Sequence, residues 1–515
     1  MGHPKQESTV PSLESDKPQG AQGEGEAASH RFDDLAAETL WDYAPAPETV
    51  SVPVADRQGL FIDGDFCPSD GKEFFPSINP ANEEVLSEIA AATQADVDRA
   101  VQAARKALPG WAALPGHERA KYLFRLARRL QERAREFAVL ETLDGGKPIK
   151  ESRDVDIPEA AKHFFYHAGW ADKLDYAFPG RQVRPVGVCA QIIPWNFPLL
   201  MAAWKLAPAL ACGNTVVLKP AETTSLTALR LAEILQEIEL PPGVVNILTG
   251  GGETGAALAA HPKVDKLAFT GSTEVGKKLA QSAAGTGKSL TLELGGKSPN
   301  IIFEDASLDQ AVEGVIQGIY FNQGHVCCAG SRLFVQEGIL PEVLGKLEWR
   351  LKSLRVGDPM DKNTDVGAIN NREQWQRIQD YLQQGRSEGA VLHQVGDSSL
   401  PDRGFWCQPS FFTGVQPSHV VAREEIFGPV LAVMSFRTPE EALQRANNTP
   451  YGLAAGIWTD KGSKIFEMAG RLQAGVVWCN TYNRFDASSP FGGFKESGFG
   501  REGGLQGLRA YVKLQ

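Results

Sequence analysis

The sequence predicts an α/β fold made of two units, each built on a mostly parallel β-sheet with helices on both faces. Short runs rich in β-branched residues alternate with helical patterns through most of the chain, which is typical of successive strand–helix–strand units. Such runs favour a parallel sheet that is covered on both faces. A length of 515 residues is sufficient for two or three domains of this kind.

The N-terminal segment, residues 1–57, is predicted to be disordered or extended. Residues 1–30 are rich in Gly, Ser, Glu, Gln and Pro and contain almost no large apolar side chains, so they are expected to form a disordered tail. Residues 31–57 differ, because Leu40, Trp41 and Tyr43 offer apolar groups that we expect to pack on a surface. The alternative for this stretch is a linker in which the tryptophan is incidental.

Globular patterning begins near residue 58. Thr93 and Asp96 have the spacing of a capping box in front of apolar residues at helical intervals, and this predicts a helix that reaches about Leu108. A second amphipathic helix is expected from near Glu118 to Leu140. Strands are expected at 186–194, 214–219, 244–249 and 266–270 in the first unit, and at 300–304, 331–336, 427–436, 453–458 and 475–480 in the second. Ligands in such sheets bind beyond the carboxyl ends of the strands.

Composition narrows the class of protein. The net charge of −11 comes without a basic patch, so a nucleic-acid partner is not expected. The seven cysteines include no pair or Cys/His cluster at zinc-ligand spacing, so we expect no metal site and a reduced, cytoplasmic location. No apolar run is long enough for a membrane span, and the N-terminus lacks the apolar core of a signal peptide.

Side chains suited to chemistry stand near the ends of these strands. Cys327 lies among small residues after a glycine turn, and it is either a nucleophile or a buried core thiol. Asn196 can donate a hydrogen bond into a crevice, or it can satisfy a turn. Glu293 precedes two glycines that permit close backbone approach, and its alternative is a capping or ion-paired carboxylate. Residues 269–276 form a strand, a glycine turn and a helix, whose N-terminus can bind a pyrophosphate.

Three patterns that imitate other sites are set aside. Residues 287–289 and 296–298 resemble the end of a phosphate-binding P-loop, but Ser282 and Thr291 stand where the first glycine of that motif is needed. His325 lies two residues before Cys327, and residues at that spacing do not face each other on a helix. We therefore interpret His325 as a bystander.

Taken together and in this order, the segments resemble the aldehyde dehydrogenase superfamily. The resemblance extends over about residues 60–511 and includes the motifs at 219–222 (KPAE), 425–429 (EIFGP) and 490–498 (PFGGFKESG). It implies the aldehyde dehydrogenase fold. The implied parts are a Rossmann-like NAD-binding domain (58–166 and 185–293), an α/β catalytic domain (294–500) and a reduced oligomerisation hairpin (167–184 and 501–515).

The resemblance also implies a mechanism in which an aldehyde is oxidised to a carboxylic acid through a thiohemiacetal and a thioester on Cys327. The oxyanion donors would be the side-chain amide of Asn196 and the backbone N–H of Cys327. Glu293 would activate the water that hydrolyses the thioester, and members that transfer the acyl group to coenzyme A lack this residue. Lys205 and Glu502 match a proton relay, with an ordinary ion pair as the alternative.

The resemblance implies a dinucleotide cofactor and a small aldehyde substrate. Lys219 and Glu222 match residues that bind the adenosine ribose, and because a carboxylate repels a 2′-phosphate, NAD is preferred and NADP is the alternative. Further cofactor positions are Ile192, Trp195, Gly252, Gly271, Ser272, Gln374, Arg377, Glu425 and Phe427. The substrate positions are Phe197, Met201, Trp204, Phe485 and Phe491, which favour an apolar or aromatic aldehyde unless they are core aromatics. Arg484 and Asp486 add polar groups near the mouth.

Assembly departs from the family pattern. The stretch 174–184 is shorter than the usual hairpin, and the final strand of the intersubunit sheet is expected to be missing. These features resemble the sixteenth aldehyde dehydrogenase family, and they predict a homodimer or the catalytic module of a longer chain. Two other functions stay open: a scaffold on the same fold, and an acyl-transferring or esterase-like use of the cysteine.

Overall fold

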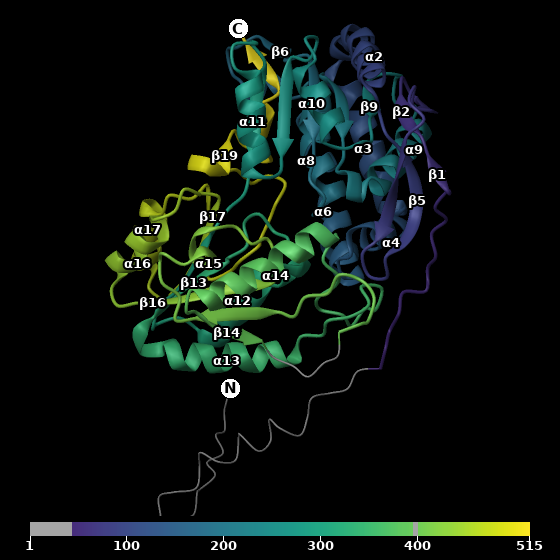
Figure 1. Cartoon of the computed structure of the whole chain (residues 1–515). Helices are drawn as coiled ribbons and strands as arrows, with labels where there is room; N and C mark the ends of the chain where they lie inside the picture. The colour runs from purple at the N-terminus through teal and green to yellow at the C-terminus, as the bar shows by residue number, and fades with distance from the viewer. Residues whose placement is uncertain (1–43, 395–399) are drawn as a thin grey trace, which may run out of the picture. The chain divides into compact units, whose positions relative to one another are not determined.

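Two large sheets organise the chain in the computed structural model, which describes residues 44–394 and 400–515 (Figure 1). Residues 45–515 cluster as one compact body, and the two sheet-based units, first and second, both belong to it. The predicted contacts of Leu40, Trp41 and Tyr43 lie outside the described residues. All nine predicted strands are present, with ends that differ from the prediction by at most three residues.

The first sheet has eight strands. They are β2 (Leu60–Ile62), β3 (Asp65–Cys67), β7 (Val188–Ile192), β8 (Thr215–Lys219), β9 (Val245–Ile247), β10 (Lys266–Thr270), β11 (Ser289–Glu293) and β19 (Gly498–Phe499). Their order is β19-β11-β10-β7-β8-β9-β2-β3, and the five strands from β11 to β9 are parallel. Strand order runs outward from β7 in both directions, so the topological switch point lies between β7 and β10, where a ligand crevice is expected.

Helices cover both faces of this sheet because successive side chains of each strand point to opposite sides. The helices of this half are α2 (Gln94–Ala113), α3 (Gly116–Glu132), α4 (Ala134–Gly145), α5 (Ile149–Glu151), α6 (Ile157–Ala168), α7 (Leu174–Ala177), α8 (Pro198–Ala211), α9 (Leu226–Glu237), α10 (Gly252–Ala260) and α11 (Thr273–Ala283). Val188 and Ala190 face the core under α2, α10 and α11, while Cys189 between them faces the core under α8 and α9. A π-helical turn (Ser152–Asp156) joins α5 to α6, and a 3-10 turn (Glu222–Thr224) follows β8.

The predictions for the first two helices have different outcomes. The capping box of α2 is confirmed: the Thr93 hydroxyl accepts from the Asp96 backbone N–H, and the Asp96 carboxylate accepts from the Thr93 N–H at 2.8 Å. The single helix expected over 118–140 is wrong, because α3 ends at Glu132 and α4 begins at Ala134. Arg133 between them has non-helical dihedral angles (φ −100°, ψ 15°), and its guanidinium binds carboxylates of α4 and α9.

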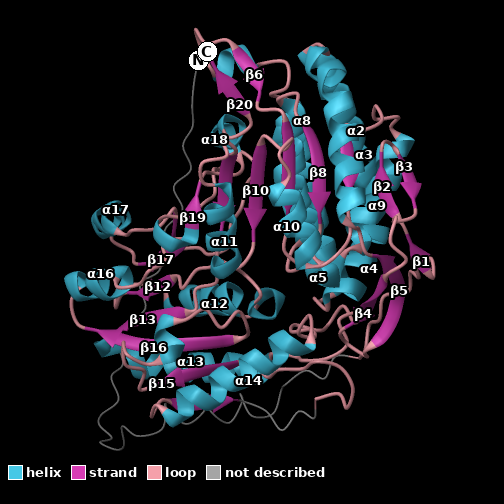
Figure 2. Cartoon of the chain, turned by 45° about the horizontal axis from the view of Figure 1, so that its top comes forward, coloured by secondary structure: helices cyan, strands magenta, loops and turns pink. Residues whose placement is uncertain are grey.

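The second sheet has seven strands (Figure 2). They are β12 (Pro299–Ile302), β13 (Arg332–Gln336), β14 (Val391–Gln394), β15 (Ser410–Thr413), β16 (Val430–Phe436), β17 (Ala454–Trp458) and β18 (Val476–Cys479). Their order is β14-β15-β16-β13-β12-β17-β18, and only β14 is antiparallel.

Helices cover the second sheet on both faces as well. Helices α12 (Leu308–Ile319) and α13 (Leu340–Ser353) cover one face. The other face is covered by α14 (Arg372–Ser387), α15 (Val420–Arg423), α16 (Pro439–Asn447) and α17 (Gly462–Arg471). Short 3-10 turns lie at Phe321–Gly324, Glu337–Ile339 and Lys495–Ser497.

The two ends of the described chain pack on these sheets. Residues 45–57 contact both halves of the molecule. The Glu48 N–H donates to the Met360 carbonyl in the second half, and the Glu48 carboxylate pairs with Arg135 on α4 in the first. A small sheet combines β1 (Arg57–Gln58), β5 (Glu84–Ala90) and β4 (Phe74–Asn79). After α18 (Gly504–Arg509), β20 (Val512–Leu514) pairs antiparallel with β6 (Val183–Pro185). After the second sheet, the chain crosses back to the first sheet, where β19 pairs antiparallel with β11.

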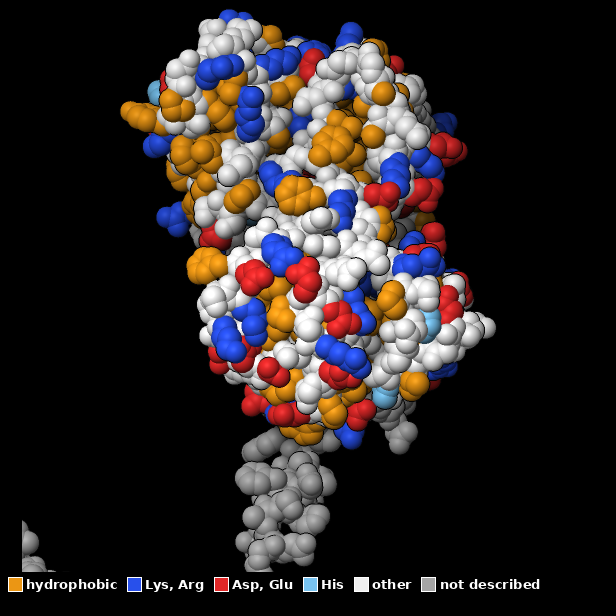
Figure 3. Space-filling view, turned by 90° about the vertical axis from the view of Figure 1, so that its left-hand side faces the viewer, with side chains coloured by type: hydrophobic (Ala, Val, Ile, Leu, Met, Phe, Trp, Pro, Cys, Tyr) orange, Lys and Arg blue, Asp and Glu red, His pale blue; other side chains and the backbone are white. Residues whose placement is uncertain are grey.

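The face shown in Figure 3 carries acidic and basic side chains interspersed with exposed apolar ones. Over the part of the chain that the structure describes, no helix combines the length and the apolar character needed to cross a bilayer.

Candidate active site

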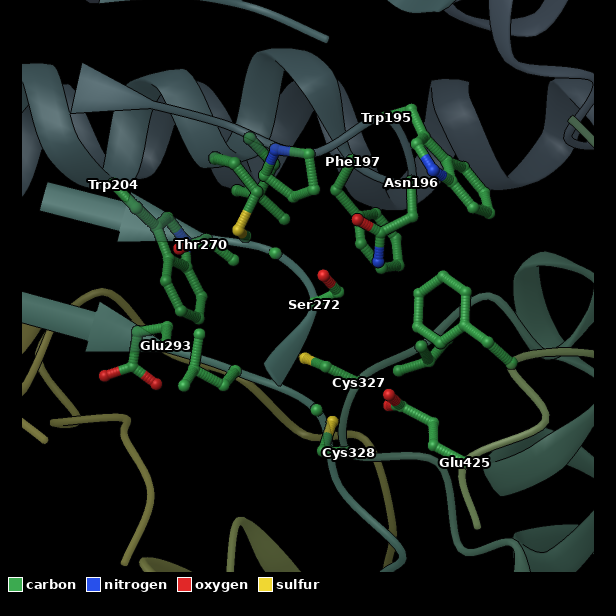
Figure 4. Close-up of a pocket in the computed structure, with 18 of the residues that line it drawn as sticks. Trp195, Asn196, Phe197, Trp204, Thr270, Ser272, Glu293, Cys327, Cys328 and Glu425 are labelled. Carbon is green, nitrogen blue, oxygen red and sulfur yellow. The ribbon is translucent and has the colours of Figure 1, made fainter. Parts of the chain in front are cut away.

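A cavity of about 550 Å³ lies where the first sheet meets the second unit (Figure 4). Three parallel strands of the first sheet end at it: β7 leads to Trp195 and Asn196, β10 to Gly271 and Ser272, and β11 ends at Glu293. Since β7 and β10 flank the topological switch point, the crevice forms at the position that the strand order predicts. Cys327 reaches it from the second unit, and in Figure 4 its side chain points to the middle of the cavity.

The turn before Cys327 has an unusual backbone. Asn322, Gln323 and Gly324 all have positive φ angles of 48°, 53° and 75°. A side chain on Gly324 would overlap the carbonyl of Gly428, so only glycine fits there. The left-handed conformation of the other two costs about 1–3 kcal/mol each, so the surroundings must hold them.

Hydrogen bonds from other segments hold that turn. The Asn322 N–H donates to the Glu151 carboxylate at 2.9 Å, and its side-chain amide donates to the Asn196 carbonyl at 2.8 Å. The Gln323 amide donates to the Ala368 carbonyl at 3.0 Å. These bonds fix the backbone just before Cys327, and therefore fix where its sulfur enters the cavity.

Asn196 is positioned by the same turn. Its buried side-chain N–H₂ donates to the His325 carbonyl at 2.8 Å, which leaves the second N–H of the amide for a ligand in the cavity. His325 itself is buried, and burial lowers its pKa to about 3, so the imidazole is neutral. Its ring packs edge-on against Trp195 and stacks on Phe427. The ring thus braces the cavity wall, in agreement with the interpretation of His325 as a bystander to the chemistry.

Glu293 is buried at 4 % exposure, and neither carboxylate oxygen has a hydrogen-bond partner among the described residues. Burial raises the pKa of Glu293 well above its usual value, and the nearby charge of Glu502 raises it further. A carboxyl group in this state holds a proton readily at neutral pH, and its ionised form is a strong base. The environment therefore suits a group that takes up a proton during a reaction.

Lys205 and Glu502 form a buried ion pair next to Glu293, with side-chain exposures of 0 % and 2 %. Glu502 lines the cavity, whereas Lys205 contacts it only through Glu502. The second oxygen of Glu502 has no partner in the described part of the chain. A chain of ionisable groups thus runs from the cavity toward Lys205 on α8.

Glu425 and Gln374, which the resemblance assigns to cofactor binding, both form hydrogen bonds with the backbone. The Gly296 N–H donates to the Glu425 carboxylate at 3.0 Å, and a Cβ on Gly295 would overlap that carboxylate. The two glycines after Glu293 therefore permit the predicted close approach, with Glu425 as the approaching group. Gln374 donates to the Phe427 carbonyl at 2.8 Å and holds a residue whose φ is 58°.

Comparison with known proteins agrees with this geometry. Residues 66–515 match the model of the aldehyde dehydrogenase family. Human retinal dehydrogenase 2 is 47% identical over 471 residues, which cover 88% of this chain and 90% of the relative. The mitochondrial aldehyde dehydrogenase of Sus scrofa is 47% identical over 491 residues, covering 91% and 94%. A structure of Bacillus cereus aldehyde dehydrogenase, described as an NAD⁺ complex, superposes with a TM-score of 0.86 at 42% identity over 89% of this chain and 96% of that one.

The chain belongs to the aldehyde dehydrogenase family. It is an NAD(P)-dependent aldehyde dehydrogenase with the aldehyde dehydrogenase fold, and the resemblance inferred from its motifs is confirmed.

Most of the predicted site residues of this dehydrogenase lie around the cavity at the switch point. Those that line it are Trp195, Asn196, Phe197, Met201, Trp204, Gly271, Ser272, Glu293, Cys327, Gln374, Arg377, Glu425, Phe427, Phe485, Phe491 and Glu502. Those that do not line it are Ile192, Lys205, Lys219, Glu222 and Gly252. Lys219 and Glu222 form an ion pair at 3.4 Å in which Glu222 is half exposed. The predicted roles of all these residues remain predictions.

Four of the five predicted substrate positions belong to an aromatic cluster in the cavity wall. Trp204 lies edge-on to Phe491 at 5.3 Å between ring centroids, and Phe485 lies 5.7 Å from Phe491. Phe197 stacks on Phe321 at 6.1 Å. All but Phe321 are among the predicted substrate positions, and they are both core aromatics and cavity walls, so the two alternatives are not exclusive.

Sequence reasoning missed two sets of residues near the cavity. One is the Asn322–Gln323 turn, for which the only signal is an amide pair before a glycine. The other lies on the π-helical turn and α6, which bring Asp156, Glu159 and His163 to the cavity wall. Nothing in their spacing distinguishes them from polar residues on an ordinary helix.

Proposed function

We propose that this dehydrogenase oxidises a small aldehyde with Cys327 as the nucleophile. The observation that supports this most directly is the convergence of Cys327, Asn196 and Glu293 on one cavity from three separate chain segments. The Cys327 thiolate would add to the aldehyde carbon, and the oxygen of that carbon would become an oxyanion. The free N–H of Asn196 and the Cys327 backbone N–H would stabilise it.

The residues around the switch point fit a dinucleotide. Helix α11 presents its N-terminus at the cavity, and the Thr270 hydroxyl is buried there without a partner among the described residues. Glu222 offers a half-exposed carboxylate for a ribose and disfavours a 2′-phosphate, so we propose NAD. When bound, NAD supplies the acceptor for the two electrons that leave the aldehyde carbon. Cofactor-contacting roles for Trp195, Ser272, Gln374, Glu425 and Phe427 belong to this proposal.

Glu293 would complete the turnover. Once the substrate carbon is oxidised, the acyl group is a thioester on Cys327. The ionised Glu293 would take a proton from water, the resulting hydroxide would attack the acyl carbon, and the carboxylic acid and the Cys327 thiolate would be released. The Lys205–Glu502 pair would then carry the proton from Glu293 toward the solvent.

One assay tests the nucleophile. The protein is incubated with NAD and a panel of aliphatic and aromatic aldehydes, and NADH absorbance is followed. Cys327→Ala should lower the rate by about 10⁴-fold or more. Cys328→Ala is the matched control: Cys328 is a buried thiol whose pKa is raised by its hydrogen bond with Cys327 and by burial, and its loss should change the rate only a few-fold. Equal rates in Cys327→Ala and the unchanged protein would refute the assignment, and no NADH from any aldehyde would favour a scaffold.

Location and assembly also belong to this proposal. We infer a cytoplasmic location from the free cysteines of the described residues. From the shortened stretch at 174–184 we infer a homodimer, with a module of a longer chain as the alternative. Analytical ultracentrifugation of the purified chain should give a dimer, and a tight tetramer would contradict it.

A further inference from the structure

The part of the cavity wall where His163 packs on Trp204 contains a polar stripe that the proposed chemistry does not use. Asp156, Glu159 and His163 line the cavity at positions i, i+3 and i+7, which lie on one face of a helix. Asp156 ends the π-helical turn, and such turns occur often at functional sites. We name these three residues the α6 stripe.

The α6 stripe holds hydrogen-bonding capacity that the protein itself does not satisfy. Asp156 is 0 % exposed and His163 is 2 % exposed, yet Asp156 Oδ1 and His163 Nδ1 have no partner among the described residues. Glu159 Oε2 is likewise buried and unpartnered within the described ranges. An unpaired buried polar atom costs about 1–3 kcal/mol, so three on one face of one helix point to a ligand that supplies the missing partner.

The chemistry of the stripe selects the kind of partner. Two of the three unpartnered atoms are carboxylate oxygens, which only accept hydrogen bonds when ionised. Burial raises the pKa of Asp156, whereas the Lys147 ammonium beside it favours the ionised form, as a bound cation would. Burial holds the pKa of His163 well below its usual value, so its neutral ring also offers an acceptor nitrogen. A group with several N–H donors and a positive charge matches this arrangement better than a hydroxyl, a methyl or a carboxylate.

The cations around the α6 stripe do not neutralise all of the nearby carboxylates, so the charge balance favours binding of one more cation. Lys147 pairs with the other oxygen of Asp156 at 2.5 Å, and Glu141 also contacts Lys147, so two carboxylates share one ammonium. Lys162 at the surface takes only Oε1 of Glu159. Trp204, which packs on His163 at 5.2 Å, offers an aromatic face that attracts cations. A small adjoining pocket is lined by both Arg484 and Asp486, whose opposite charges offset each other near the mouth.

We propose that the α6 stripe is a specificity site for an aldehyde that carries a protonated primary amine at its far end. The ammonium would donate to Asp156, Glu159 and His163 while the aldehyde carbon reaches Cys327. This inference rests on the proposed function, since it assigns the substrate class of the same cavity.

The test measures substrate preference. The values of kcat/KM are determined for ω-amino aldehydes of increasing chain length, and for the isosteric aldehydes that end in methyl, hydroxyl or carboxylate. The amine-ended aldehyde of the best length should exceed its methyl-ended isostere at least tenfold, as one hydrogen bond to a charged group would give. A methyl-, hydroxyl- or carboxylate-ended aldehyde with the highest kcat/KM would overturn the inference while leaving the proposed function intact. No NADH from any aldehyde would overturn both.

A matched pair of variants locates the preference. Glu159→Gln keeps the shape of the side chain and should lower the ratio of amine-ended to methyl-ended kcat/KM roughly tenfold. Glu118→Gln is the control, because Glu118 forms the same (i,i+3) ion pair with a lysine on α3 without lining the cavity. An unchanged ratio in Glu159→Gln, or an equal change in Glu118→Gln, would place the selectivity elsewhere and refute the role of the stripe.

Discussion

The loop that we propose contacts the cofactor and the wall that we propose contacts the substrate differ in how their buried polar groups are hydrogen bonded. On the cofactor side, Glu425 accepts from a backbone N–H and Gln374 donates to two backbone carbonyls. On the substrate side, both oxygens of Glu293 and the indole N–H of Trp204 are buried without a partner in the described part of the chain. The same cavity thus joins a hydrogen-bonded loop to a wall whose polar groups lack partners. The Thr270 hydroxyl, beside the N-terminus of α11, also has no partner among the described residues.

This difference separates two uses of polar groups. A hydrogen-bonded side chain holds a loop in one conformation, and here it holds backbone with positive φ such as Phe427. An unpaired buried group lowers stability, and it is tolerated where a reactant supplies the partner during turnover. We therefore expect mutations on the cofactor side to act through loop position, and mutations on the substrate side to act on the reaction itself.

Among the variants discussed for the substrate wall, Glu293→Gln should lower steady-state turnover the most. The amide cannot take a proton from water, so the thioester should form once per enzyme and then persist. The expected result is an initial burst of NADH followed by steady-state turnover that is lower by about 10²–10⁴-fold. Since burial raises the pKa of Glu293, the unchanged protein should gain turnover as pH rises and the base ionises, and Gln should remove this dependence. A variant without a burst would assign Glu293 to an earlier step.

Variants of Lys205 and Glu502 distinguish a proton relay from an ion pair that is only structural. Lys205→Met leaves a buried carboxylate without its cation and should lower the free energy of unfolding by about 3–5 kcal/mol, as measured by urea denaturation. The double variant Lys205→Met/Glu502→Met should recover much of that loss, because both buried charges are gone. If the pair moves protons, steady-state turnover should stay low in the double variant. Recovery of turnover together with stability would leave only the structural role.

The extent to which this site follows from sequence differs between its parts. Asn196 and Glu293 are predictable because the strands before them are plain in the sequence, and parallel strands bring their carboxyl ends to one edge. The left-handed turn at Asn322 and Gln323 is not, because it depends on partners in distant segments such as Glu151 and Ala368. The α6 stripe is not predictable either, since whether a polar helix face meets water or a cavity is decided by tertiary packing.

Gln374→Ala tests the hydrogen-bonded loop. The change removes the two hydrogen bonds that hold the carbonyls of Ile426 and Phe427, so that loop should become less ordered. The KM for NAD should rise about tenfold, while kcat at saturating NAD stays nearly unchanged. Gln376→Ala is the control on the same helix, because the exposed Gln376 side chain donates to Asp380 on that helix and does not line the cavity. A fall in kcat with an unchanged KM for NAD would contradict the distinction between the hydrogen-bonded loop and the substrate wall.

Glu151 is a buried carboxyl group that does not line the cavity but supports the turn before Cys327. It accepts from the Asn322 N–H, and burial together with the charge of Asp156 raises its pKa to about 8. The folded protein therefore binds more protons than the unfolded chain between the unfolded pKa of about 4.5 and about 8. The contribution of this group to stability is fully present below that window and is lost as pH rises through it.

Glu151→Gln should flatten this loss, because an amide does not titrate yet can still accept from Asn322. The free energy of unfolding, measured in urea from about pH 5 to pH 8, should fall less steeply in the variant, by at most about 1.4 kcal/mol per pH unit for the one proton involved. Some slope should remain, since burial also raises the pKa of Glu141 and of Asp144 to about 7. Glu132→Gln, at an exposed carboxylate on α3, should run parallel to the unchanged protein. Parallel curves for Glu151→Gln as well would mean that Glu151 is ionised in the folded state, and the turn that carries Cys327 would then rest on a buried charge rather than on a neutral acid.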